Sequence, residues 1–220
     1  MVAAPLVKRV LYALPSDPNS RFIRLILGEL GLPFSLKNPS VPGEGPKDIP
    51  TLQDENGALI SYAGCIAEYL DESYPSTLIG STPVLRAQTR QVWRYIEGPV
   101  SERITRPLLY ERVHRRMSGL GTPDSAVIQR ANSAKGYYFK ELERLIDMDV
   151  WIAGPDLTLA DLSLSAQLSL LDYLDLVDWT SYPTLSDYYR RVKSRPSMRI
   201  ILSDRIEGIE PSSTYADLDF

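Results

Sequence analysis

Residues 49–60 read Ile-Pro-Thr-Leu-Gln-Asp-Glu-Asn-Gly-Ala-Leu-Ile, and this stretch decides the fold of the chain. Two short apolar runs, around 51–53 and 58–60, flank the turn signal Asp54-Glu55-Asn56-Gly57, which predicts a β-hairpin. A helical pattern over about 62–73 follows the hairpin. The order strand, strand, helix is the expected second half of a small α/β domain.

The residues before this hairpin predict the first half of the same domain. Residues 8–14 are rich in strand formers and end at the turn signal Pro15-Ser16-Asp17-Pro18. From Ser20 to Leu30 apolar residues recur at helical spacing, and a short strand is expected around 34–36. Residues 38–50 hold four prolines and two glycines, so we expect a loop there. The α/β domain is therefore expected over residues 1–80.

The pattern of the chain changes after Pro83. Residues 84–118 and 124–148 predict two long helices, and Thr158-Leu159-Ala160-Asp161 resembles a capping box at the start of an apolar helix. Further helices are expected after Tyr182-Pro183 and after Arg195-Pro196. The fold class is therefore an α/β domain followed by an all-α domain over residues 84–204, with a tail over residues 205–220.

Composition excludes several classes of function. The chain has 220 residues, 44% of them hydrophobic, and its net charge of −4 disfavours a nucleic-acid partner. No apolar run reaches about 18 residues, so we expect no membrane span, and residues 1–6 lack the features of a secretory signal. The sequence has one cysteine, Cys65, and one histidine, His114, which argues against an internal disulfide and a Cys/His metal site. We expect a cytoplasmic protein without a metal ion.

Three groups of motifs carry a resemblance to a known family. They are Leu11-Tyr12 and Arg24-Leu25 with Glu29-Leu30-Gly31-Leu32-Pro33-Phe34, then Ile49-Pro50 with Ile66 and Tyr69-Leu70, then Gly154 with residues 157–162. Over nearly the whole chain this order resembles the glutathione transferase superfamily. The resemblance implies a thioredoxin-like domain followed by a helical domain.

The resemblance also implies where a glutathione site would lie. The bond before Pro50 would be cis, and the backbone of Ile49 would pair with the cysteinyl group of the ligand. The family's usual Glu-Ser pair, which holds the γ-glutamyl group at a helix start, aligns with Tyr62 and Ala63. Neither side chain can replace its counterpart, and Ser61 lies one residue too early. We therefore expect a degenerate site without a glutathione cofactor.

The residues after the first strand do not favour catalysis. Where the family's catalytic hydroxyl is a serine, it often directly precedes the proline at this place, but here Asp17 precedes Pro18. A carboxylate beside a thiol raises the pKa of the thiol, which opposes its activation. Ser16 is the nearby substitute, and it is a candidate catalytic residue only if the protein is an enzyme. We favour the alternative that Ser16, Asp17 and Ser20 form the turn and cap the first helix. We expect Cys65 to be buried as a small apolar residue.

The tail ends in Tyr-Ala-Asp-Leu-Asp-Phe, a short peptide with apolar anchors and negative charges. Together with the degenerate site, this ending resembles transferase-like division proteins that bind filaments of FtsZ, the bacterial tubulin homologue. The resemblance implies a partner-binding surface that includes Tyr215, Asp217, Asp219 and Phe220. Glu111 is a weaker candidate, and its alternative is a local ion pair. The alternative for the tail is packing against its own helical domain.

Three functional hypotheses follow. The leading one is a non-enzymatic, homodimeric adaptor that binds FtsZ filaments and favours a curved form. The second is a glutathione S-transferase that conjugates glutathione to an electrophile, with Ser16 as the hydroxyl and Ser61 in place of the lost serine. The third is a regulator that binds RNA polymerase, as the stringent starvation proteins do.

Overall fold

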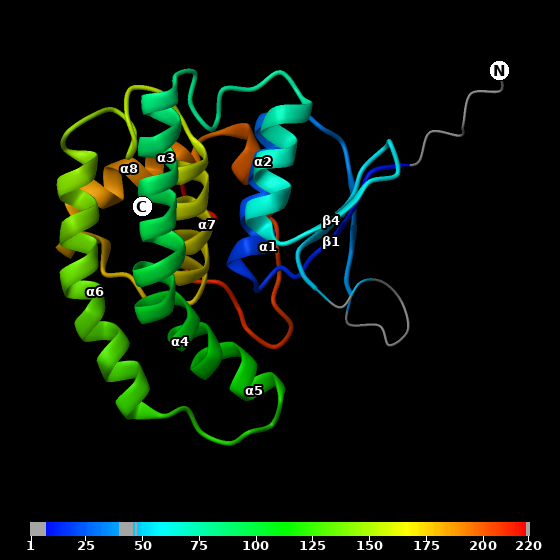
Figure 1. Cartoon of the computed structure of the whole chain (residues 1–220). Coiled ribbons are helices and arrows are strands. Elements are labelled where there is room, and N and C mark those ends of the chain that lie inside the picture. The colour runs from blue at the N-terminus through cyan, green and yellow to red at the C-terminus, as the bar shows by residue number, and fades with distance from the viewer. Residues whose placement is uncertain (1–7, 40–45, 47, 219–220) are drawn as a thin grey trace, which may run out of the picture.

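The computed structural model describes residues 8–39, 46 and 48–218. In this part of the chain a four-stranded sheet has the strand order β2-β1-β3-β4, with bounds β1 Val10–Tyr12, β2 Ser35–Lys37, β3 Thr51–Gln53 and β4 Leu59–Ser61. β1 and β2 are parallel, and the other neighbouring strands are antiparallel. A parallel pair needs a crossover connection, which helix α1 (Pro18–Glu29) supplies. Figure 1 shows this thioredoxin-like sheet beside a set of longer helices.

The predicted hairpin and the helix after it are confirmed. The Asp54 amide donates to the Ala58 carbonyl at 2.9 Å, and Gly57 takes the positive φ of 85° that the turn requires. Helix α2 runs over Ala63–Ser73. The strands and α1 also lie where the sequence predicts them, with bounds shifted by a few residues.

The structural reading of the turn before α1 is confirmed for two of its three residues. Asp17 is the N-cap, and its carboxylate accepts from the amide and the hydroxyl of Ser20, both at 2.6 Å. The Ser20 hydroxyl accepts in turn from the Leu14 amide at 3.1 Å. Asp17 therefore satisfies the free donors at the start of α1.

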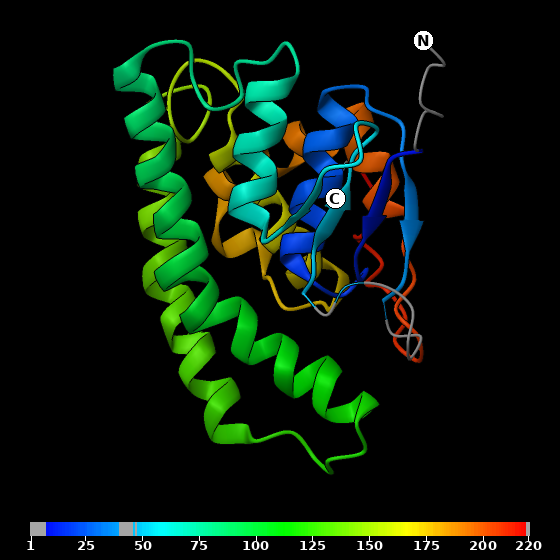
Figure 2. The same cartoon turned by 45° about the vertical axis from the view of Figure 1, so that its right-hand side comes forward.

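The first long helix predicted after Pro83 is one helical run with π-helical parts. It consists of α3 (Pro83–Tyr95), η1 (Ile96–Thr105), α4 (Arg106–Leu109), η2 (Tyr110–His114) and α5 (Arg115–Met117). Pro99 and Pro107 lie inside the run and remove helical donors. Figure 2 shows the bend that results, with α4 and α5 turned away from the axis of α3. The second long helix, α6, spans Ser125–Ile146.

The remaining helices complete the C-terminal helical domain. They are α7 (Leu159–Tyr173), η3 (Trp179–Ser181), α8 (Pro183–Lys193), η4 (Pro196–Met198) and α9 (Arg199–Leu202). The expected capping box is present. Buried Asp161 accepts from the amide and hydroxyl of Thr158 at 2.8 and 2.9 Å, and also from the Ile152 amide and the Tyr188 hydroxyl, both at 2.9 Å.

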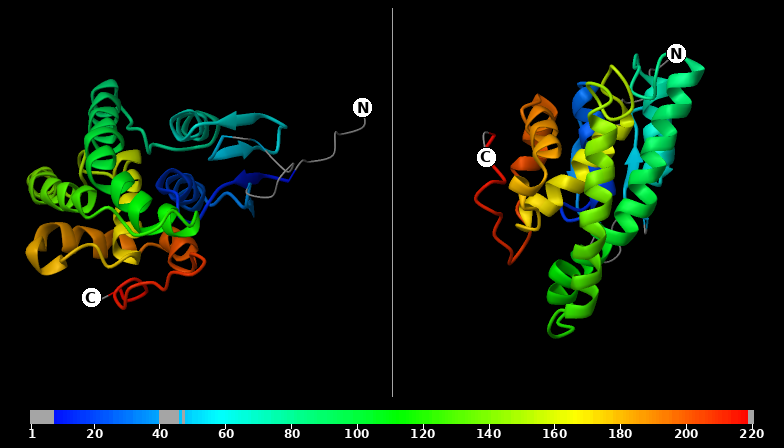
Figure 3. Two further views of the ribbon diagram at one scale, coloured as in Figure 1. Left: turned by 90° about the horizontal axis from the view of Figure 1, so that it is seen from below. Right: turned by 90° about the vertical axis from the view of Figure 1, so that its left-hand side faces the viewer.

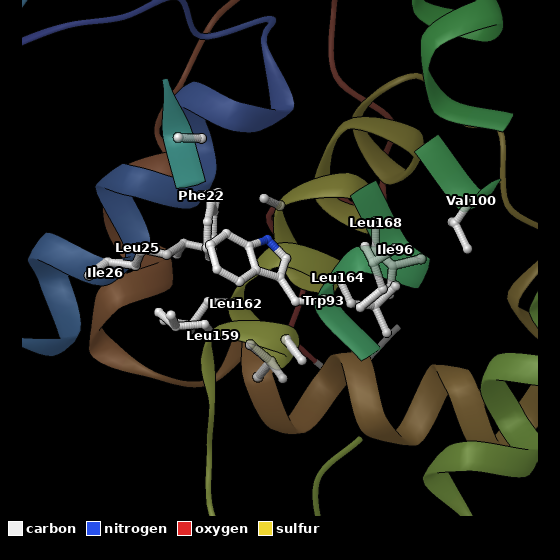
Figure 4. Close-up of a cluster of buried hydrophobic side chains, with 14 of the residues drawn as sticks. Phe22, Leu25, Ile26, Trp93, Ile96, Val100, Leu159, Leu162, Leu164 and Leu168 are labelled. Carbon is white, nitrogen blue, oxygen red and sulfur yellow. The ribbon is translucent and has the colours of Figure 1, made fainter. Parts of the chain in front are cut away.

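The sheet half and the helical half share one hydrophobic core. Every residue of α7 is buried, and α7 packs against both α1 and α3. The rings of Phe22 and Trp93 meet there, with centroids 5.3 Å apart (Figure 4). Because side chains of both halves fill this core, the packing does not mark a boundary between two domains. The expected bounds 1–80 and 84–204 therefore stay a prediction.

Candidate functional site

The place expected for glutathione is built by the β3–β4 hairpin. The Ile49–Pro50 peptide bond is cis, as expected. Thr51 pairs with Ser61 across the two strands, which brings Pro50 beside the start of α2. The Thr51 hydroxyl lies 2.8 Å from the Ser61 hydroxyl and donates to the Asp48 carbonyl at 2.6 Å. Ser61 is thus held by the hairpin, which argues against its use as a substitute for the lost serine.

The start of α2 is formed by Tyr62 and Ala63, the residues expected in place of the family's Glu-Ser pair. Tyr62 is the N-cap residue, with a positive φ of 69° and no side-chain bond to the helix. Its side chain is 64% exposed and offers a phenol where an ammonium group would need a carboxylate. Ala63, the first residue of α2, is buried and has no hydroxyl. The four residues expected to form the degenerate site therefore lie close together, and the loss of glutathione binding stays a prediction.

A cavity of about 360 Å³ opens between α2 and α3. Glu68 and Arg90 form an ion pair of 2.8 Å at this cavity, and Cys65 lines it. The expectation that Cys65 is buried is wrong, because the side chain is exposed. The inner face of α2 is formed by Ile66, Ala67 and Leu70 instead, and Cys65 precedes this stripe by one residue.

The β1–α1 turn places Ser16 next to a carboxylate committed to the helix. Ser16 is buried, with 9% of its surface exposed. Burial raises the pKa of Asp17 above its usual value, while the bonds from Ser20 and the charge of His114 act in the opposite direction. Ser16 stays a candidate only under the enzyme hypothesis, since no described group beside it is placed as a general base.

Two of the expected partner-binding residues are not on the surface. Tyr215 is completely buried, so its side chain cannot touch a partner while the tail is in place. Glu111 is also buried, and its carboxylate lies 2.7 Å from Arg115 and accepts from the Asp124 amide at 2.8 Å. Glu111 is therefore a local ion pair that holds the loop before α6. Tyr215 is held by residues distant in sequence, and Glu111 by the next helical turn and the loop before α6, while their part in binding a partner stays a prediction.

Of the other tail residues expected to bind a partner, the structure describes Asp217. Asp217 is exposed and so is Leu218 beside it. Asp219 and Phe220 lie outside the described residues. The tail over residues 206–215 packs back on the chain, as the alternative reading expected.

Sequence reasoning missed a buried polar cluster beneath this tail. Lys193 of α8 is 1% exposed and lies 3.1 Å from Asp172 of α7. Arg21 of α1 is 0% exposed and donates to the hydroxyls of Ser169 and Tyr215. Burial lowers the pKa of Lys193, and the charge of Asp172 opposes this change. A charged residue on a polar helix gives no sequence signal of such burial.

No three His, Cys, Asp or Glu side chains of the described ranges gather as a metal ion would require. Within the same ranges, every helix is too short or too polar to cross a lipid bilayer.

Comparisons with known proteins agree with this architecture. The model of the glutathione S-transferase C-terminal domain matches residues 128–203. FtsZ-localized protein A of Caulobacter vibrioides is 31% identical, over 97% of this chain and 99% of the relative. Among solved structures, a glutathione S-transferase from Rhodospirillum rubrum F11 has a TM-score of 0.92 and 32% identity, and covers 96% of this chain and 100% of its own. FzlA from C. crescentus has a TM-score of 0.88 and 31% identity, and covers 97% and 100%. The chain therefore belongs to the glutathione S-transferase superfamily.

Proposed function

We propose that the protein is a non-enzymatic adaptor of cell division that binds FtsZ filaments and favours their curved form. The observation that carries this proposal is the likeness to FtsZ-localized protein A, which extends over 97% of the chain. The start of α2 supports the non-enzymatic part, because Tyr62 and Ala63 offer no partner to the charged groups of glutathione.

The mechanism needs no covalent chemistry. A protein that binds a bent filament more tightly than a straight one shifts the filament population toward the bent form by its difference in affinity. A homodimer would present two equivalent surfaces, so that it bridges neighbouring filaments or subunits and gains avidity. Light scattering on the purified chain tests the dimer, and a monomer at micromolar concentration would remove bridging from the mechanism.

Co-sedimentation with FtsZ polymers tests the proposed partner. We expect the protein to pellet with assembled FtsZ and to stay in the supernatant without polymer, with saturation at a fixed ratio to FtsZ. Electron microscopy of the same samples should show more strongly curved filaments. Absence of pelleting at tens of micromolar protein would contradict the proposal.

A working glutathione S-transferase is the second candidate function. The observation that favours it is the R. rubrum transferase structure, which is as similar to this chain as the division protein is. Titration calorimetry with glutathione separates the two functions. Micromolar binding favours the transferase, and absence of heat at millimolar glutathione favours the adaptor. The variant Ala63→Ser is a useful companion, since it restores one hydroxyl at the start of α2 and should tighten any residual binding.

A further inference from the structure

Residues 206–215 form a strap that lies along the outer side of the helical domain, against α7 and α8 (Figure 3). The hydroxyl of Tyr173 accepts from the Ile206 amide at 2.9 Å and donates to the Ile209 carbonyl at 2.7 Å. The Ser212 amide donates to the Tyr173 carbonyl at 2.9 Å. One buried tyrosine of α7 thus satisfies three backbone groups of the strap.

Tyr215 is the last residue of the strap, and its buried side chain anchors the strap to the domain. Its ring meets Tyr173 edge to face, with centroids 4.8 Å apart, and the guanidinium of Arg21 lies 5.6 Å from the ring centroid. Its hydroxyl accepts from Arg21 at 3.0 Å and donates to the Ile201 carbonyl. Tyr215 therefore ties the strap to α1 in the sheet half and to α9 in the helical half.

Thr214 is held on its other side. Its hydroxyl donates to Asp172 at 2.8 Å, and the ammonium group of Lys193 donates to its carbonyl at 2.5 Å. Lys193 and Asp172 are themselves a buried ion pair. Residues 214 and 215 are consequently held by contacts with four helices, α1, α7, α8 and α9, although they belong to no helix or strand.

The chain turns to the surface immediately after Tyr215. The Asp217 amide donates to the Thr214 carbonyl at 3.1 Å, a bond that closes a tight turn. Ala216, Asp217 and Leu218 are all exposed. An exposed peptide with an acidic and an apolar side chain therefore begins directly after a wholly buried side chain.

We infer that Tyr215 is a positioning residue, which sets the point and the direction in which residues 216–218 leave the surface. The inference rests on the proposed function, and it adds that this exposed peptide is a part of the chain that contacts an FtsZ filament. A free peptide loses backbone freedom when it binds, and a peptide that is already held loses less. Tyr215 thus serves the partner without touching it, and removal of its hold should weaken filament binding by about tenfold.

The test distinguishes the effect of the direction of the peptide after Tyr215 from the effect of its presence. One variant inserts Gly-Ser-Gly between Tyr215 and Ala216, which keeps the buried contacts of Tyr215 and frees the direction of the ending. A second variant stops after Tyr215, and a third inserts the same three residues between Met148 and Asp149, at an exposed place outside any helix. Co-sedimentation with FtsZ polymers gives the dissociation constant of each. Thermal unfolding and hydrogen exchange at the Ser212 and Tyr215 amides check that the strap stays in place.

We expect the insertion after Tyr215 to weaken binding about tenfold, with parental unfolding temperature and amide protection. The variant that stops after Tyr215 should bind more weakly still, and the insertion at Met148 should bind like the parent. Parental affinity of the first insertion, with weak binding of the shortened chain, would overturn the inference and leave the proposed function intact. Parental affinity of the shortened chain would overturn the inference because the ending then makes no contact. Failure of the parent to pellet would refute the proposed function itself.

Discussion

Lys193→Met removes a buried cation from beneath the strap. The side chain is 1% exposed, and its ammonium group lies 3.1 Å from Asp172 and donates to the Thr214 carbonyl. Methionine has a similar length, so packing changes little, but the carboxylate of Asp172 stays buried without its cation. Removal of one partner of a buried ion pair costs about 3–5 kcal/mol of unfolding free energy. In a chain of this size that corresponds to a fall of roughly 6–20 °C in the unfolding temperature.

Urea unfolding followed by circular dichroism measures this cost. Arg190→Met is the matched control on the same helix, because its contact with Asp187 is 3.5 Å long and exposed, and such pairs contribute about 0–1 kcal/mol. The double variant Lys193→Met with Asp172→Asn should lose less than the two single changes together, since it leaves no buried charge unpaired. Exposed ion pairs contribute about 0–1 kcal/mol. If the free energy of unfolding of Lys193→Met differs from that of the parent by no more than this amount, the ion pair does not hold the strap and the reasoning is wrong.

Three further predictions concern buried or paired side chains. The carboxylate of Asp161 accepts from four donors, and in the variant Asp161→Asn the amide NH₂ group would face two of them. We expect this change to lower the free energy of unfolding, measured by thermal unfolding, by about 2–6 kcal/mol. The control Asp178→Asn, at an exposed position, should leave the unfolding temperature unchanged. Burial alone would raise the pKa of Glu29, but the bonds and charge of Arg195 bring it below 4.5. The stabilisation by ionised Glu29 is therefore present above pH 4.5 and is lost as the pH falls further. The test compares the free energies of unfolding of the parent and Glu29→Gln over about pH 3–6, the range in which carboxyl groups usually titrate. A difference that stays constant over this range would contradict the prediction. Burial raises the pKa of Tyr215 to about 12 from 10.0, so the stability advantage of the parent over Tyr215→Phe should be full below pH 10.0 and shrink up to about pH 12.

The elements of the fold were accessible from the sequence because their signals are local. Turn residues between apolar runs predicted the β3–β4 hairpin, and the Thr158–Asp161 spacing predicted the cap of α7. The position of Tyr62 and Ala63 was accessible for the same reason, since both residues directly follow the hairpin. The bounds of α3 to α5 were less accessible, because π-helical turns have no distinct sequence pattern.

Burial of the polar side chains was decided by tertiary structure. Arg21 and Tyr215 are separated by 194 positions, and Lys193 and Thr214 by 21, so neither contact leaves a periodic or neighbouring signal in the sequence. From the sequence alone, a tyrosine or a lysine in this part of the chain is expected at the surface. Only the structure shows that a facing helix supplies a buried partner for its polar group. The sequence by itself determined which segments are helices and strands. The tertiary structure alone decided that Tyr215 faces inward, because the free energy of burying its ring and pairing its hydroxyl depends on α1, α7 and α9 meeting at one place.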